Sequence, residues 1–288
     1  MSTSTRMMRI AASLGGCAIF VLIVIWGIGA GKFVKPVGGD IPTIFQPVGD
    51  AFRSGQPVYA WKDLPFFYAP PLVIVFAALS WLPTPVLFTS ILFADVVALR
   101  YMAGGWLRVG YLLWYVVLPF EFAAGQLNII IAAVLVAAVR GSRTALPALF
   151  ALAKISPALA VNPARWRPFL AWTLLLIALT LPWWWLWAQW LEQLLRGWQT
   201  PVGPQIPIPF LVRLPVGLLL VATRTRLGRV TGAVIATPAF YWGSLVLFLA
   251  PMAIGFDLWD ERQVHRARLS TGEAQVARPR PIEAQAPD

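Results

Sequence analysis

Long apolar runs separated by short basic segments dominate the chain. The runs cover residues 10–30, 66–82, 85–102, 106–122, 126–139, 145–161, 167–190, 207–222 and 230–255. A hydrocarbon core of about 30 Å needs roughly 18–20 apolar residues at about 1.5 Å per residue. Prolines bound or interrupt many of these runs, namely Pro83, Pro85, Pro119, Pro157 and Pro182. The pattern predicts an all-α polytopic membrane helix bundle of eight to ten membrane segments, some of them short or broken.

Composition agrees with this interpretation. Of the 288 residues, 59% are hydrophobic and only 12% are charged, and the mean hydropathy is +0.71. A soluble domain carries about 25% charged residues. The net charge of +11 does not indicate nucleic-acid binding, because the arginines stand in groups between apolar runs, as in Arg140/Arg143 and Arg165/Arg167. Such groups of arginines are typical of loops on the cytoplasmic face of a membrane, where they lie next to the membrane lipids.

The order of the runs predicts one membrane domain over residues 1–256. Arg6 and Arg9 precede the first run, which is longer than the apolar part of a signal peptide, so we expect a retained helix with a cytoplasmic N-terminus. Residues 31–65 then form a first extracytoplasmic loop. Strict alternation of the crossings would put Arg100/Arg108 and Arg140/Arg143 outside, which favours half-spanning or broken helices that line a cavity.

Residues 257–288 are polar and charged, and we expect a disordered tail there. The dense tryptophans at 183–190 favour an interfacial helix end, since tryptophan prefers the boundary between membrane and water. Cys17 and His265 are the only residues of their types. An intrachain disulfide, a His/Cys metal site and a histidine relay are therefore excluded, and we expect neither a metal nor a cofactor.

Polar side chains within apolar runs are the first candidates for chemistry, because burying them in lipid is costly. Asp95, Glu121, Lys154 and the pair Gln126 and Asn128 are such residues. Each has an ordinary alternative, a hydrogen bond or ion pair between helices that only holds the bundle together. Lys154 stands out because Ser156-Pro157 follows it and breaks the helix beside a cation, which makes room for an anionic ligand such as a phosphate.

The predicted first loop offers a second candidate region. Asp40 follows Gly38-Gly39 soon after the first membrane run, and the weakly amphipathic stretch from Ile44 to Phe52 favours a helix along the membrane surface. A carboxylate at the edge of a membrane cavity, on the side away from the cytosol, suits a general base acting on a polar acceptor.

Four motifs, in this order, resemble the glycosyltransferase 87 family, membrane enzymes of the GT-C superfamily. Asp40 is followed by a G-x-x-x-Y element at Gly55–Tyr59, and Tyr68-Ala69-Pro70 leads into the next helix. Pro119 then precedes Gly125-Gln126-Leu127-Asn128. Lys154-Ile155-Ser156-Pro157 comes before Arg165-Trp166-Arg167. The resemblance covers roughly residues 10 to 190.

The resemblance implies an inverting, mannosyltransferase-like transfer of a sugar from a polyprenyl-phosphate donor to a lipid or glycan acceptor. Asp40 would be the general base, with Asp50 as the second choice. Lys154 or Arg53 would offset charge on the departing phosphate. Gln126 and Asn128 would bind sugar hydroxyls or the phosphate, and Tyr59 and Tyr68 complete the expected substrate-binding residues.

Two other functions fit the same residues. A transporter or flippase would use Asp95, Glu121 and Lys154 along a substrate path, and an inactive scaffold subunit of an envelope glycan pathway would need no chemistry. The first loop discriminates among them, because a transporter needs no carboxylate at Asp40.

Overall fold

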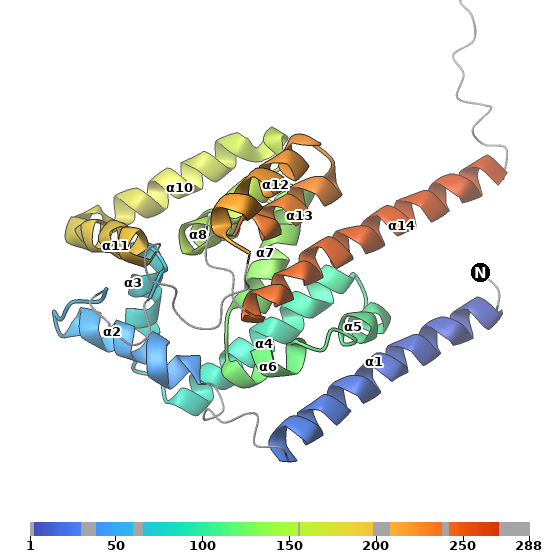
Figure 1. The fold of residues 1–288 in the computed structure, drawn as a ribbon, viewed down its shortest axis with the longest axis horizontal. Coiled ribbons are helices and arrows are strands. Elements are labelled where there is room, and N and C mark those ends of the chain that lie inside the picture. Colours follow the sequence, from blue (N-terminus) through green and yellow to red (C-terminus); the bar gives the residue numbers. More distant parts are fainter. Residues whose placement is uncertain are drawn as a thin grey trace, which may run out of the picture.

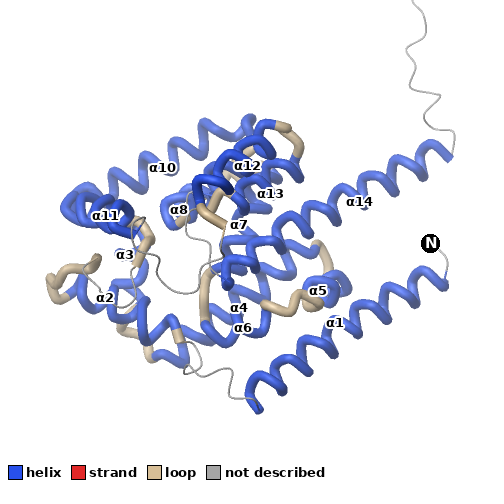
Figure 2. Tube along the Cα trace, viewed as in Figure 1, coloured by secondary structure: helices blue, strands red, loops and turns tan. Residues whose placement is uncertain are grey.

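The computed structural model describes residues 3–29, 39–59, 66–154, 156–197, 208–237 and 242–270, and all regular structure among them is helical (Figure 2). The first half contains α1 (Thr3–Gly29), η1 (Ile41–Phe45), α2 (Gln46–Arg53), α3 (Pro70–Leu79), α4 (Thr84–Ala103), α5 (Trp106–Leu112), α6 (Leu118–Ala124) and α7 (Asn128–Arg140). The second half contains α8 (Leu146–Ala153), α9 (Ser156–Ala160), η2 (Pro163–Arg165), α10 (Trp166–Thr180), η3 (Leu181–Trp183), α11 (Trp184–Gly197), α12 (Phe210–Ala222), α13 (Arg226–Ile235), η4 (Trp242–Phe248) and α14 (Leu249–Ser270). The predicted all-α bundle is confirmed.

Four helical stretches in the described part of the chain are long and apolar enough to cross a membrane. They are Met7–Ile28, Thr84–Ala103, Pro163–Gln193 and Gly243–Leu269. Only 17% of the apolar window in the first and 11% in the third is buried inside the protein, so these surfaces suit contact with lipid. The count is below the eight to ten segments predicted, because several apolar runs fold as short or broken helices instead.

The breaks fall at glycine and proline. The run 106–122 divides into α5 and α6, and α6 ends at Gly125, whose φ of +64° ends the helix without strain. The axes of α6 and α7 are bent by 114° across this break, which makes the pair one broken span or a re-entrant loop. The run 145–161 divides at Lys154, which is extended, and α9 begins at Ser156-Pro157. The expected short and broken helices are therefore present.

Helix α7 lies at the centre of the bundle (Figure 1), in contact with α4, α8, α9, α13 and α14. Its apolar side chains are buried on all sides, including Ile129, Ile131, Leu135 and Val139. A helix that is apolar all round is removed from water, either among other helices or in lipid. Because α7 is enclosed in this way, polar side chains at its first turn lie inside the protein.

Helix α1 lies at the side of the bundle and contacts α5 (Figure 1). A side chain added at Gly16 would overlap the Gly110 carbonyl, so the two glycines permit a close approach of the backbones. Polar groups add to this contact, because the Tyr111 hydroxyl donates to the Arg9 carbonyl at 3.0 Å and the Trp114 indole donates to the Ala12 carbonyl at 2.8 Å. The N-terminal half of α1 is thereby fixed beside α5.

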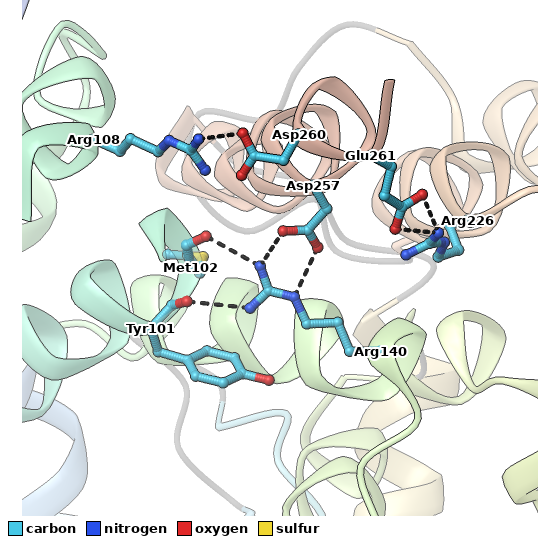
Figure 3. Close-up of polar contacts among 8 residues, drawn as sticks. All are labelled: Tyr101, Met102, Arg108, Arg140, Arg226, Asp257, Asp260 and Glu261. Carbon is cyan, nitrogen blue, oxygen red and sulfur yellow. Dashed lines mark hydrogen bonds and ion pairs between the residues drawn. The ribbon is translucent and has the colours of Figure 1, made fainter. Parts of the chain in front are cut away.

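Helix α14 continues to Ser270, so the predicted start of a disordered tail at 257 is wrong. Its three carboxylates each meet an arginine from another helix (Figure 3). The pairs are Arg108–Asp260 at 2.5 Å, Arg140–Asp257 at 2.8 Å and Arg226–Glu261 at 2.6 Å. We call these three pairs the α14 clamp. Hydropathy counts such carboxylates as solvent-exposed, but arginines that are distant in sequence partly neutralise them here. Residues 271–288 lie outside the described part.

Candidate functional site

The break between α6 and α7 brings together three of the polar residues singled out in the sequence. Glu121 lies on α6, Gln126 in the turn and Asn128 at the first position of α7. The left-handed backbone at Gly125 turns the chain sharply, with a bend of 114° between the axes of α6 and α7. The start of α7 therefore lies beside the Glu121 side chain. Glu121 is 2% exposed and Asn128 is 5% exposed, so both are removed from solvent.

The Asn128 side chain is the centre of the resulting hydrogen-bond network. Its amide nitrogen donates to the Glu121 carboxylate, at 3.1 Å to Oε2 and 3.3 Å to Oε1, and to Gln126 Oε1 at 2.7 Å. Its amide oxygen accepts from Lys154 Nζ at 2.7 Å. Asn128 thus bridges a buried carboxylate and a cation. We call Glu121, Gln126, Asn128 and Lys154 the central polar cluster.

Lys154 reaches the cluster because α8 ends one residue before it. Its backbone is extended (φ −138°, ψ 127°), and its amide still donates to the Phe150 carbonyl at 2.8 Å. Helices α8 and α9 both pack against α7, which places the lysine beside Asn128. Ser156, which opens α9, is fully buried, and its hydroxyl has no hydrogen-bond partner among the described residues. A helix break that leaves a buried hydroxyl unpaired next to a lysine suits a polar ligand.

Two further carboxylates act electrostatically on the cluster. Asp40, just before η1, is 8% exposed, and Asp95 on α4 is 1% exposed. Both carboxylates lie near enough to Glu121 for a long-range electrostatic interaction with it, as Lys154 does. Oδ1 of Asp95 has no hydrogen-bond partner among the described residues. Glu121, Asp40, Asp95 and Lys154 therefore belong to one poorly solvated part of the bundle.

Gly243 in η4 lies against the side chains of the central polar cluster. A side chain added there would overlap Glu121 Oε1 and come within 3.0 Å of Gln126 Oε1 and 3.6 Å of Asn128 Nδ2. The adjacent segment is held in place by a hydrogen bond from the Tyr115 hydroxyl to the Leu245 carbonyl at 2.7 Å. Since η4 leads directly into α14, this segment connects the cluster to the α14 clamp.

Asp50 and Arg53 lie elsewhere, on the outer face of α2. They form an ion pair at 2.5 Å with side chains 56% and 47% exposed. Helix α2 confirms the helical conformation predicted for most of the stretch from Ile44 to Phe52. Whereas Asp40 is buried and acts on Glu121, Asp50 is exposed and paired.

Tyr59 and Tyr68 belong to an aromatic group with Phe45, Phe66 and Phe76. The Tyr59 hydroxyl donates to the Tyr68 carbonyl at 2.8 Å and ties the end of the first loop to the start of α3. Burial raises the pKa of Tyr59, so its hydroxyl stays a neutral donor. Tyr59 thus has a structural role, and its predicted contact with substrate remains a prediction.

The family resemblance assigned no role to Glu121, Ser156 or Gly243, although Glu121 was a candidate for the substrate path of a transporter. The position of Glu121 inside an apolar run was a signal, but its partners come from another helix. Gly243 carried no signal, because a glycine in an apolar run is common, and Ser156 was noted only as part of the helix break beside Lys154. Among the described residues, no group of three histidines, cysteines or carboxylates is arranged to hold a metal ion.

These features define a class: an all-helical membrane protein with a charged, buried site between broken helices. Comparison with protein families found no matching model, and comparisons with curated proteins and with solved structures found no significant similarity. What the site does therefore has to be argued from its residues.

Proposed function

We propose that this protein is a membrane glycosyltransferase that moves a sugar, in a mannosyltransferase-like reaction, from a polyprenyl-phosphate donor to a lipid or glycan acceptor. The proposal rests on the four motifs that resemble the glycosyltransferase 87 family. One observation carries it further: Gln126, Asn128 and Lys154, which come from two of these motifs, belong to one partly buried hydrogen-bonded cluster.

The chemistry of the cluster suits a phosphate-bearing sugar. A half-buried lysine held by an amide offers charge to a departing phosphate, and such preorganised electrostatic stabilisation is often the largest contribution to catalysis. The amides of Gln126 and Asn128 present donors and acceptors of the kind that sugar hydroxyls need. Ionisable groups inside a membrane domain are kept at a cost, which favours a functional role.

In the proposed reaction the acceptor hydroxyl oxygen attacks the anomeric carbon from the face opposite the phosphate. The bond from that carbon to the phosphate oxygen breaks, and its electron pair leaves with the polyprenyl phosphate. Asp40 takes the hydroxyl proton, and Lys154 offsets the new negative charge on the phosphate. The configuration at the anomeric carbon is inverted in this single displacement.

The arrangement of the arginines supports a cytoplasmic N-terminus in a cell membrane. Arg108 and Arg140 both pair with the same stretch of α14, and Tyr111, close to Arg108, contacts Arg9 at the start of α1. These basic residues therefore share the N-terminal end of α1, the end that the positive-inside bias assigns to the cytosol. Helix α1 is about 40 Å long at about 1.5 Å per residue, so the chain leading to Asp40 starts from the opposite side.

The test is sugar transfer by the purified full chain, reconstituted with radiolabelled polyprenyl-phosphate sugars and a membrane lipid extract. Asp40→Asn should lower the transfer rate by about 10²–10⁴-fold, the range for losing a general base, while the protein stays inserted and folded. Full activity in Asp40→Asn with an inactive Asp50→Asn would move the base to Asp50. Full activity in both variants would refute a base in this region.

A lipid transporter or flippase is the second candidate. The 114° break between α6 and α7 beside buried acids favours it, because transporters bind substrates at interrupted helices. The same purified protein distinguishes the two functions. A transporter would move a fluorescent polyprenyl-phosphate sugar across a vesicle bilayer without forming a new glycosidic bond, and Asp40→Asn would leave this movement unchanged.

A further inference from the structure

A pocket of about 470 Å³ lies apart from the central polar cluster, between the end of α2 and the tryptophan-rich start of α11. The volume is within the range of about 300–1,000 Å³ found for small-molecule sites. One wall is the turn 52–58, and the other is formed by residues 183–189. We call it the tryptophan pocket. Figure 1 shows α2 and α11 close together on this side of the molecule.

The wall on the α2 side is held in a defined shape. Gly55 adopts φ +70°, and the amides of Gly55 and Gln56 donate to the carbonyls of Phe52 and Ala51, at 3.2 and 2.8 Å. Tyr59, a few residues on, is fixed by its hydrogen bond to Tyr68. The G-x-x-x-Y element therefore shapes this wall rather than the central polar cluster.

The wall on the α11 side is aromatic. Trp183 packs edge-on against Phe52 with ring centroids 5.7 Å apart, which joins the two walls. The Trp190 indole donates to the Phe67 carbonyl at 2.8 Å and anchors α11 to the chain before α3. Trp185 lines the pocket but remains 45% exposed, so part of its ring is available to a ligand.

The polar groups of the pocket favour an uncharged ligand. Gln189 Oε1 is buried there and has no hydrogen-bond donor among the described residues. A buried acceptor without a donor is unfavourable, and a ligand hydroxyl would supply the missing hydrogen bond. Arg53 is paired with Asp50, so the charges on this wall cancel. An anion would have to compete with Asp50 for that guanidinium.

We propose that the tryptophan pocket binds a sugar ring of a neutral carbohydrate. A pyranose carries hydroxyls for Gln189 Oε1 and for the donors of Arg53 and Gln56, and its C–H face packs on an aromatic ring such as that of Trp185. Identifying this carbohydrate as the acceptor rests on the proposed transferase function. Sugar binding itself does not.

The experiment measures binding rather than transfer. The purified full chain in nanodiscs is titrated with methyl glycosides of mannose, glucose, galactose and arabinose, and with inorganic phosphate, and binding is followed by saturation-transfer NMR. Trp185→Ala should weaken binding of the preferred glycoside by about tenfold, because the sugar ring loses the aromatic surface on which it packs. Gln189→Leu should weaken it by about three- to tenfold, the effect of one hydrogen bond.

The matched control is Trp184→Ala, since Trp184 is the adjacent tryptophan, is 66% exposed and does not line the pocket. It should change affinity by less than about twofold, within the usual effect of a surface substitution. Because the titration contains no polyprenyl-phosphate donor, glycoside binding is measured independently of transfer, which separates this proposal from the proposed function. The proposal is overturned if no glycoside binds, if Trp184→Ala and Trp185→Ala act equally, or if only phosphate binds.

Discussion

The central polar cluster and the α14 clamp use the same kinds of charged residue in opposite ways. In the clamp, arginine meets carboxylate directly, and the side chains of Arg140 and Asp257 are 25% and 24% exposed. In the cluster, no direct ion pair links Lys154 to Glu121, and the Asn128 amide stands between them. Direct pairs neutralise each other and hold helices together. A cation and an acid kept apart by an amide remain able to act on a ligand.

The two regions also differ in what surrounds them. The clamp joins α14 to α5, α7 and α13 in good arginine–carboxylate geometry, with Arg140 donating to both oxygens of Asp257 at 2.8 Å (Figure 3). Around the cluster, by contrast, Asp95 Oδ1 and the Ser156 hydroxyl have no hydrogen-bond partner among the described residues. We therefore expect substitutions in the clamp to change stability, and substitutions in the cluster to change function first.

The largest effect is expected at Lys154. Lys154→Met should lower transfer by at least about 100-fold, as expected for losing a preorganised electrostatic group. It should also destabilise the protein by about 1–3 kcal/mol, because the Asn128 amide oxygen loses its donor and Glu121 loses the nearby cation. Transfer assays and thermal unfolding in nanodiscs measure the two effects. The double variant Glu121→Gln/Lys154→Met should recover stability but not activity. Recovery of both stability and transfer would show that Glu121 and Lys154 have only a structural role.

Gly243→Ala separates function from stability within the cluster. The added methyl would overlap Glu121 Oε1, the end of a flexible side chain that can move away. Displacing this carboxylate from Asn128 should lower transfer by roughly 10–100-fold, on the order of one lost charge-assisted hydrogen bond. The melting temperature should fall by only a few degrees, about 1 kcal/mol. Gly255→Ala is the control, because nothing lies within 4 Å of its added methyl. Unchanged transfer in Gly243→Ala would show that the Glu121 position is irrelevant.

Arg140→Ala tests the strongest pair of the clamp. Losing two hydrogen bonds to a half-buried carboxylate should destabilise the protein by about 1.5–3 kcal/mol. Transfer per folded molecule should stay within about twofold, since such a substitution removes no group from the cluster. Denaturation curves and normalised assays give the two values. A large loss of transfer with normal stability would mean that α14 controls the cluster through η4.

Arg226→Ala should have the smallest effect. Its pair with Glu261 is more exposed, with side chains 37% and 53% accessible, and exposed pairs contribute about 0–1 kcal/mol. The same denaturation assay, repeated at high salt, should show no further loss in this variant because the screened pair is already gone. A loss equal to that of Arg140→Ala would show that the clamp acts as one network.

Much of the fold follows from the sequence, as individual helices illustrate. The length of the runs that became α1 and α4 predicted spanning helices, and Pro157 predicted the break beside Lys154. The two runs from 106 to 139 did not reveal their 114° bend, because helix direction after a turn depends on packing. The tryptophans at 183–190 were expected only to mark an interface, yet Trp183 and Trp190 make specific contacts with the first loop region.

The sequence by itself determined that this is an apolar, helical membrane protein with a few costly polar groups, because hydrophobicity, proline and glycine act locally. The candidate residues Gln126, Asn128 and Lys154 were visible for the same reason. Only the tertiary structure decided which groups meet. Lys154 and Asn128 lie on different helices, as do Asp257 and Arg140, and their contacts depend on how α7, α9 and α14 pack. Hydrogen bonds and ion pairs act over a few ångströms, so residues distant in sequence become partners only through folding.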